Sequence, residues 1–303
     1  MSHWKSTVPR VIDYLRALRP AHWTKNGVVF AAYLFAMGDR QQPVDAGDLV
    51  LAIWSAACFC LLSSAVYLIN DIRDIEQDRH HPVKRLRPIA AGRVSIRSAL
   101  FLALLLGALA LAGAFRVGRD LLLVLTAYAV IQVAYTFGLK KIALVDVFVI
   151  AAGFVLRAMA GAVAIQVEIS PWLLLCTLLL ALFLALCKRR HEKVTLPPGE
   201  NSTRTSMSMY DTQLLDQLIA MVSGATIVCY ALYTLWPDTV EKFGTTHLGF
   251  TIPFVLFGLF RYLDLVYRHE KGGQPERVLL TDIPLLIDLA LYGTTVAVIL
   301  WRH

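Results

Sequence analysis

Long apolar runs recur along the whole chain and are separated by short polar or basic segments. These runs fall at roughly 24–38, 49–69, 98–115, 120–139, 142–164, 172–188, 214–236, 247–266 and 281–301. A helix that crosses a hydrocarbon core of about 30 Å needs about 20 mostly apolar residues, and all but the first run come near this length. The pattern therefore predicts an all-α integral membrane protein with about nine transmembrane helices.

The connections between the runs are too short to hold a soluble domain. The two longest span about 70–97 and 189–213, and the second contains a Pro-Pro-Gly turn signal followed by serines and threonines. We therefore expect residues 1–303 to form a single transmembrane helical domain.

The composition excludes the common soluble classes. Of 303 residues, 57% are hydrophobic and 17% are charged, and the mean hydropathy is +0.59, whereas a soluble protein is about 45–50% apolar and about 25% charged. A secreted disulfide scaffold, a disordered regulator and a conventional cytosolic enzyme are thus excluded. The net charge of +7 comes from basic residues between the apolar runs, so it indicates loops beside a membrane and no nucleic-acid partner.

Lysine and arginine residues are concentrated on one side of the predicted helices. The N-terminal segment and the connections at 70–97 and 189–213 carry most of them. The opposite side has only five, namely Arg40, Arg116, Arg119, Lys242 and Arg302. Because cytoplasmic loops carry the excess of positive charge, we expect the N-terminus and the long loops in the cytoplasm and the C-terminus outside.

The most informative segment is an acidic stretch at the cytoplasmic end of the second run. If the helix continues there, Asp71, Asp74 and Asp78 lie on one face, and Asn70 lies beside Asp74. Three carboxylates and an amide that converge would repel one another unless a cation binds, and hard oxygen ligands suit Mg²⁺ held together with substrate phosphates. We predict a Mg²⁺–diphosphate site formed by these four residues. The alternative is a solvated helix end whose acids pair with the neighbouring arginines.

A cluster of cations follows this acidic face directly. Lys84, Arg85 and Arg87 lie in the same loop, and cationic donors of this kind bind the phosphate oxygens that a metal leaves free. We therefore predict that all three bind substrate. The alternative is that they only satisfy the excess of positive charge in cytoplasmic loops.

These motifs resemble those of the UbiA-type intramembrane prenyltransferase superfamily. The segments RPAHWTKN, SSAVYLINDIRDIEQDRHHPVKRLRPIAAG, YTFGLKKIALVDVFVIAAGFVLRAMAGAVA and KRRHE resemble its decaprenyl-phosphate phosphoribosyltransferase branch. The resemblance covers roughly residues 18–236. It implies one helical bundle around a central cavity open to the cytoplasmic side, in the cytoplasmic (inner) membrane of a bacterium.

The resemblance also implies a reaction. The enzyme would transfer phosphoribose from phosphoribosyl pyrophosphate to a polyprenyl (decaprenyl-like) phosphate, with Mg²⁺ assisting departure of the pyrophosphate. The product would be polyprenyl phosphoryl phosphoribose, which serves synthesis of an arabinose-containing cell envelope. In this reading Asp71, Asp74, Asp78 and Asp146 are the catalytic residues.

One departure from the superfamily pattern favours this branch. Prenyltransferases of the superfamily carry a second aspartate-rich motif after the sixth span, whereas this chain has Lys188, Arg189 and Glu192 there, and Tyr210 further on. Cations at this place suit a bare acceptor monophosphate better than a metal-bound diphosphate. We therefore count these four residues among the substrate-binding residues.

Four further residues complete the predicted substrate site. Arg157 lies inside an apolar run, where an ion is costly unless it faces a cavity or a partner. Tyr135 and Lys140 lie at the cytoplasmic end of the fourth run and match the branch, so they are expected near ribose or phosphate, and Lys25 opens the first run. The alternatives are a structural ion pair for Arg157 and interfacial anchoring for the two lysines.

Two other functions remain open from the sequence. One is transfer of a prenyl group from a prenyl diphosphate to an aromatic acceptor, as elsewhere in the superfamily. The other is membrane transport, for which Asp146 and Arg157 would line a pathway. Transport is the weaker alternative, because the acids lie at one edge of the predicted bundle and transporter sites lie near the midplane. The oligomeric state stays open.

Overall fold

The computed structural model describes residues 11–39, 42–168, 170–195, 210–268, 272–273, 278 and 280–301. Within this part the chain is all-helical, and eight helices are long and apolar enough to cross a membrane. These are α3 (Ala46–Arg73), α5 (Ile96–Val117), α6 (Arg119–Phe137), α7 (Val145–Ala164), α8 (Pro171–Thr195), α9 (Thr212–Leu235), α11 (Ile252–Arg268, with the 3₁₀ turn η5, His247–Thr251, before it) and α13 (Ile283–Trp301). The chain is a multi-pass membrane protein.

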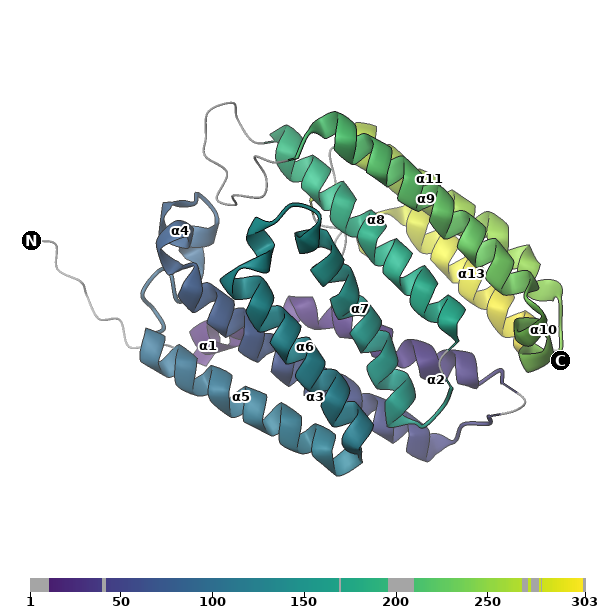
Figure 1. The fold of residues 1–303 in the computed structure, drawn as a ribbon, viewed down its shortest axis with the longest axis horizontal. Helices are drawn as coiled ribbons and strands as arrows, with labels where there is room; N and C mark the ends of the chain where they lie inside the picture. The colour runs from purple at the N-terminus through teal and green to yellow at the C-terminus, as the bar shows by residue number, and fades with distance from the viewer. Residues whose placement is uncertain are drawn as a thin grey trace, which may run out of the picture.

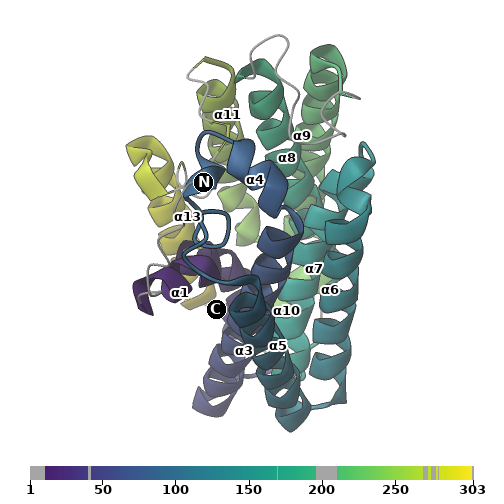
Figure 2. The same cartoon turned by 90° about the vertical axis from the view of Figure 1, so that its left-hand side faces the viewer.

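Shorter elements lie between and beside these helices. They are α1 (Val11–Leu18), η1 (Pro20–Phe30), α2 (Ala31–Ala36), α4 (Ile75–His80), η2 (Lys84–Leu86), η3 (Leu139–Lys141) and α10 (Pro237–Phe243). Figure 1 shows the long helices running side by side, with α4 at one end of the bundle and α2 and α10 at the other. In Figure 2, α1 lies crosswise to α3 and α5.

Local sequence signals set several of the helix boundaries. Asp45 caps α3, because its Oδ1 accepts from the backbone N–H of Gly47 at 2.6 Å and of Asp48 at 3.1 Å, while Asp48 accepts from the Asp45 N–H at 3.0 Å. Ser95 caps α5 by accepting from the Ser98 N–H at 3.1 Å, and Pro171 begins α8. These caps satisfy backbone donors that the helices leave free.

The first expected span, 24–38, differs from the other eight. It is divided between η1 and α2, with η1 in the tighter 3₁₀ geometry from Pro20 onward. The segment packs along α3 and α7, where buried Val29 and Asn26 face the bundle. Tertiary contacts therefore replace the regular helix that the hydropathy predicts.

The helix α8 ends later than the sequence predicted. The loop was expected from 189, but α8 continues to Thr195, because a charged helix can extend beyond the apolar layer and gains the i,i+3 ion pair of Arg189 and Glu192. Residues 196–209 of that expected loop lie outside the described part of the chain.

Small residues allow the helices to approach closely. Ala99 and Ala103 of α5 pack with Ala65 and Leu68 of α3 in one buried cluster. Gly161 of α7 is the tightest contact, because a Cβ there would lie 1.9 Å from the carbonyl oxygen of Val29. The backbone of η1 thus lies directly against α7. Large apolar side chains cover the outer surface instead, as expected for a protein surrounded by lipid.

Candidate active site

The acidic face predicted at the end of α3 is present, although the helix changes direction within it. Asp74 lies at the junction between α3 and α4 with non-helical backbone angles. The Asp74 N–H still donates to the Asn70 carbonyl at 2.9 Å, and the Asp78 N–H donates to the Asp74 carbonyl at 2.8 Å. This continued i to i−4 bonding keeps Asp71, Asp74 and Asp78 on one face.

Arginines from two distant segments contact the two buried carboxylates of this face. Arg87 donates from Nη1 to Asp78 Oδ2 at 2.6 Å and to Asp71 Oδ1 at 3.1 Å. Arg19, between α1 and η1, donates from Nη2 to Asp71 Oδ1. Burial lowers the pKa of the Arg19 guanidinium from its usual value, and the charge of Asp71 opposes that shift.

The third carboxylate is contacted by a lysine from the connection between α6 and α7. Lys140 of η3 places Nζ 2.5 Å and 2.7 Å from the two oxygens of Asp74 and 3.4 Å from Asn70 Oδ1. Lys140, expected near ribose or phosphate, thus lies beside the acidic motif in the structure. Asp74 is the least buried of the three carboxylates, so it is the one most open to exchange its partner.

A second charged cluster lies where α7 begins and α8 ends. Asp146 has no exposed surface; it accepts from Arg189 Nε at 2.7 Å and from the Tyr210 hydroxyl at 2.6 Å. Arg189 also donates from Nη1 to Glu192 at 2.6 Å, but its buried Nη2 has no hydrogen-bond partner in the described part of the chain. Tyr135 of α6 is close enough to interact electrostatically with this guanidinium.

Tyr210 ties this cluster to the segment before α7. Its oxygen accepts from the Leu144 backbone N–H at 2.7 Å, and Leu144 has a φ of 65°, which non-glycine residues rarely adopt. Burial, followed by the hydrogen bond to Asp146, raises the pKa of the Tyr210 hydroxyl, so the hydroxyl remains a donor. Lys140 contacts the acidic face and Leu144 contacts Tyr210, and the two residues are four positions apart. Their Cα atoms are therefore at most about 14 Å apart. The two clusters thus lie at the same end of the bundle.

Arg157 lies deeper in the bundle, and neutral groups surround it. Its guanidinium donates to Asn26 Oδ1 at 2.8 Å, to the Tyr128 hydroxyl at 2.9 Å and to the Gly153 carbonyl at 2.9 Å. Its charge also lies 5.2 Å from the ring centre of Phe154. These contacts hold η1 against α6 and α7, and Asp146 takes Arg189 as its partner instead.

The remaining predicted residues lie at more open positions. Lys25, Lys84 and Lys188 are half-buried, whereas Arg85 is exposed. The sequence prediction omitted Arg19 from the site. Two signals were available, since Arg19 begins the segment RPAHWTKN and precedes a proline. Its partner Asp71 is 52 residues away in the sequence, however, and only the fold brings the two side chains together.

The donor set fits a metal shared with substrate. Within the described residues, no three His, Cys, Asp or Glu side chains converge closely enough to hold a metal ion alone. Mg²⁺ usually takes one or two carboxylates and completes its shell with phosphate oxygens and water. Asp74 and its neighbours Asp71, Asp78 and Asn70 supply this kind of hard oxygen donor.

Comparison with known proteins connects this arrangement to one family. Residues 27–280 match the UbiA prenyltransferase family. Two curated relatives are the decaprenyl-phosphate phosphoribosyltransferases of Mycobacterium tuberculosis (strain CDC 1551 / Oshkosh) and Mycolicibacterium smegmatis. The first is 36% identical over 290 residues, which is 95% of each chain. The second is 36% identical over 300 residues, which covers 95% of this chain and 93% of the relative.

A solved structure shows the same fold at low identity. The UbiA homolog from Archaeoglobus fulgidus, solved bound to DMAPP and Mg²⁺, superimposes with a TM-score of 0.71. It is 20% identical, and the match covers 95% of this chain and 99% of that one. The family match extends over most of the chain, and the helical arrangement agrees with it. The chain belongs to the UbiA prenyltransferase family.

Proposed function

We propose that this chain is a Mg²⁺-dependent decaprenyl-phosphate phosphoribosyltransferase that uses phosphoribosyl pyrophosphate as donor and a polyprenyl phosphate as acceptor. The observation that carries the proposal is the identity of 36% over 95% of the chain to curated enzymes of that name. The geometry supports it, because two separate charged clusters, one rich in carboxylates and one with a buried arginine, lie at one end of the bundle.

The carboxylate cluster is the donor site. Asp71, Asp74, Asp78 and Asn70 would hold Mg²⁺ together with the donor diphosphate. When bound, the metal would neutralise charge on the pyrophosphate and act as a Lewis acid for its departure. The cations that now pair with these carboxylates, Arg19, Arg87 and Lys140, would then bind phosphate oxygens, and Lys84 and Arg85 extend the same cationic surface.

The arginine cluster is the acceptor site. Asp146 and Glu192 fix the Arg189 guanidinium through Nε and Nη1, which leaves Nη2 to donate to an anionic oxygen. Lys188, the preceding residue, adds a second cation for a phosphate monoester. Tyr210 orients Asp146 rather than the substrate, and Tyr135 lies beside the same guanidinium.

The chemistry requires little from the protein beyond positioning and charge. The bond from the anomeric carbon to the pyrophosphate oxygen breaks with its electron pair, and a new bond forms to an oxygen of the lipid phosphate. That phosphate is already ionised, so no strong general base is needed. The residues would act by holding both anions in line and stabilising the departing charge. Arg157 would contribute by holding η1, through Asn26, beside the central cavity, which we expect to open at this end. Lys25 of η1 would bind substrate.

The proposed location follows from the charge of the loops. We place the protein in the bacterial cytoplasmic membrane with its N-terminus and active site in the cytoplasm and its C-terminus outside. In a variant lacking the five native cysteines, Glu76→Cys should resist membrane-impermeant thiol reagents in intact cells, whereas Arg116→Cys should react. The reverse pattern would overturn the orientation.

A two-substrate assay tests the activity. Purified protein with Mg²⁺ and labelled phosphoribosyl pyrophosphate should form a labelled lipid only when polyprenyl phosphate is added. A product formed instead from a prenyl diphosphate and an aromatic acid would establish the prenyltransferase alternative. Substrate movement into proteoliposomes without any new covalent product would establish transport. Asp74→Asn protein provides the matched control of strongly reduced activity.

A further inference from the structure

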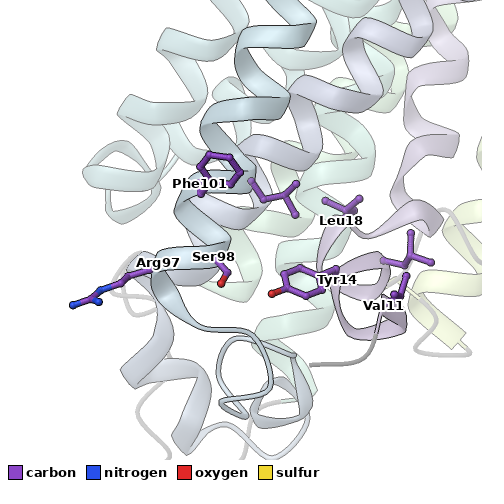
Figure 3. A pocket seen from close by; sticks show the side chains of 8 residues that line it. Val11, Tyr14, Leu18, Arg97, Ser98 and Phe101 are labelled. Carbon is purple, nitrogen blue, oxygen red and sulfur yellow. The ribbon is translucent and has the colours of Figure 1, made fainter. Parts of the chain in front are cut away.

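A pocket lies outside the two charged clusters, between α1 and the start of α5. It has a volume of about 590 Å³, a size typical of sites for small ligands. Its lining is mostly apolar and comes from Val11, Tyr14, Leu15, Leu18, Arg97, Ser98, Phe101 and Leu102. Figure 3 shows Phe101 and Leu18 toward one side of the pocket and Tyr14 and Val11 toward the other.

The helix α1 has the properties of a helix that lies in the membrane interface. Val11, Ile12 and Leu15 are 76%, 51% and 50% exposed, and α1 lies crosswise to the long helices (Figure 2). An exposed apolar face on a crosswise helix at the end of a bundle is typical of an interfacial segment. In a membrane, a pocket beside such a helix would open toward the boundary between lipid tails and headgroups.

The attachment of α1 leaves the pocket side free. Asp13 accepts from Arg93 at 2.8 Å, and the Leu18 carbonyl accepts from Ser64 Oγ at 3.0 Å. These contacts hold the helix to α3 and to the segment before α5 without filling the pocket. Arg93 also neutralises Asp13, which is the acidic side chain of α1.

The rim of the pocket is cationic. Arg97 lines the pocket, is exposed and extends outward from it (Figure 3). In the part of the chain that the structure describes, its guanidinium has no ion-pair partner. An apolar pocket with an arginine at its outer edge complements a lipid whose acyl chain lies inside and whose anionic headgroup lies at the arginine, and juxtamembrane arginines attract such lipids.

We propose that the α1–α5 pocket binds an anionic glycerophospholipid, with an acyl chain against Leu15, Leu18 and Phe101 and the headgroup phosphate at Arg97. The site has a structural link to the carboxylate cluster. Leu18 lines the pocket, and the next residue is Arg19, which contacts Asp71. A bound lipid would thus fix the helix that ends directly before this arginine.

Lipid titration followed by native mass spectrometry tests the site. Delipidated full-length protein in neutral detergent should bind dioleoylphosphatidylglycerol more tightly than dioleoylphosphatidylcholine. Arg97→Gln should weaken phosphatidylglycerol binding about fivefold, because an arginine near an anionic lipid contributes about a factor of five. Phosphatidylcholine binding should not change. Arg116→Gln, an exposed arginine at the other end of α5, is the matched control and should have no effect.

A second variant tests the apolar part of the pocket separately. Ser98→Trp should fill the pocket and abolish the tight phosphatidylglycerol site without changing any charge; if that protein is not monodisperse, Leu15→Asn replaces it and should weaken binding. Equal losses in R97Q and R116Q, or normal binding in the filled variant, would refute the proposal. If polyprenyl phosphate binding falls in R97Q while phosphatidylglycerol binding is unchanged, the pocket belongs to the acceptor and the proposal is wrong.

Discussion

Replacing Tyr210 with phenylalanine removes a single oxygen that connects the segment before α9 to the start of α7. That oxygen donates to Asp146 at 2.6 Å and accepts from the Leu144 N–H at 2.7 Å. Tyr210 is 2% exposed and Asp146 is fully buried, so water does not readily replace the lost bond. The substitution leaves Arg189 as the remaining partner of Asp146 in the described part of the chain.

The expected loss of stability can be worked from these two bonds. A hydrogen bond to a charged group contributes about 1.5–3 kcal/mol and one between neutral groups about 0.5–1.5 kcal/mol. Y210F should therefore lower the free energy of unfolding by about 2–4 kcal/mol. Tyr267→Phe is the matched control, because Tyr267 also donates to a carboxylate, Asp216, at 2.8 Å. Tyr267 is 40% exposed, so its loss should cost less than about 1 kcal/mol.

Denaturation of both variants in the same mild detergent, followed by circular dichroism, measures this difference. The Michaelis constant for polyprenyl phosphate should also rise in Y210F, because Asp146 no longer holds Arg189 in one orientation, while that for phosphoribosyl pyrophosphate should change less. Equal destabilisation by Y210F and Y267F would show that the buried hydroxyl does not organise the cluster, and the reasoning would fail.

Three further tests address separate parts of the structure. Asp74→Asn should reduce turnover by about two orders of magnitude, the loss typical of removing one preorganised electrostatic group, with an unchanged elution profile; near-normal turnover would mean a solvated helix end. Gly161→Ala should destabilise the fold by about 1–3 kcal/mol, whereas Gly107→Ala, whose Cβ meets nothing within 4 Å, should be tolerated in the same thermal assay. Lys188→Ala should raise the Michaelis constant for polyprenyl phosphate and Arg85→Ala that for phosphoribosyl pyrophosphate; equal shifts for both substrates would contradict the assignment of the two clusters.

Hydropathy predicted the long helices well because each span must satisfy its backbone hydrogen bonds within itself. The fifth expected run, 142–164, begins three residues before α7, and the seventh, 214–236, agrees closely with α9. The first run was the exception. The geometry of η1 depends on the contact of Asn26 with Arg157, a residue 131 positions away, and local pattern carries no information about such a contact.

The same distinction applies to the candidate site. The carboxylates of the acidic face were predictable because three residues within one helical stretch share a face by geometry alone. Their partners were not predictable in detail, since Arg19 and Lys140 reach Asp71 and Asp74 across 52 and 66 residues. Residues inside one helix can be placed from spacing, but contacts between helices need the order in which the helices pack.

The pairing of every carboxylate in the acidic face has a consequence for how ligands enter. Asp71, Asp74 and Asp78 face Arg19, Arg87 and Lys140, so three negative and three positive charges cancel before any substrate arrives. A divalent ion alone would have to compete with the three cations for the carboxylates. A free diphosphate would have to compete with the carboxylates for the three cations. Metal and diphosphate together would exchange partners with both sets, so that each carboxylate faces the metal and each cation faces the diphosphate. By linkage, each ligand must then strengthen binding of the other by the same factor.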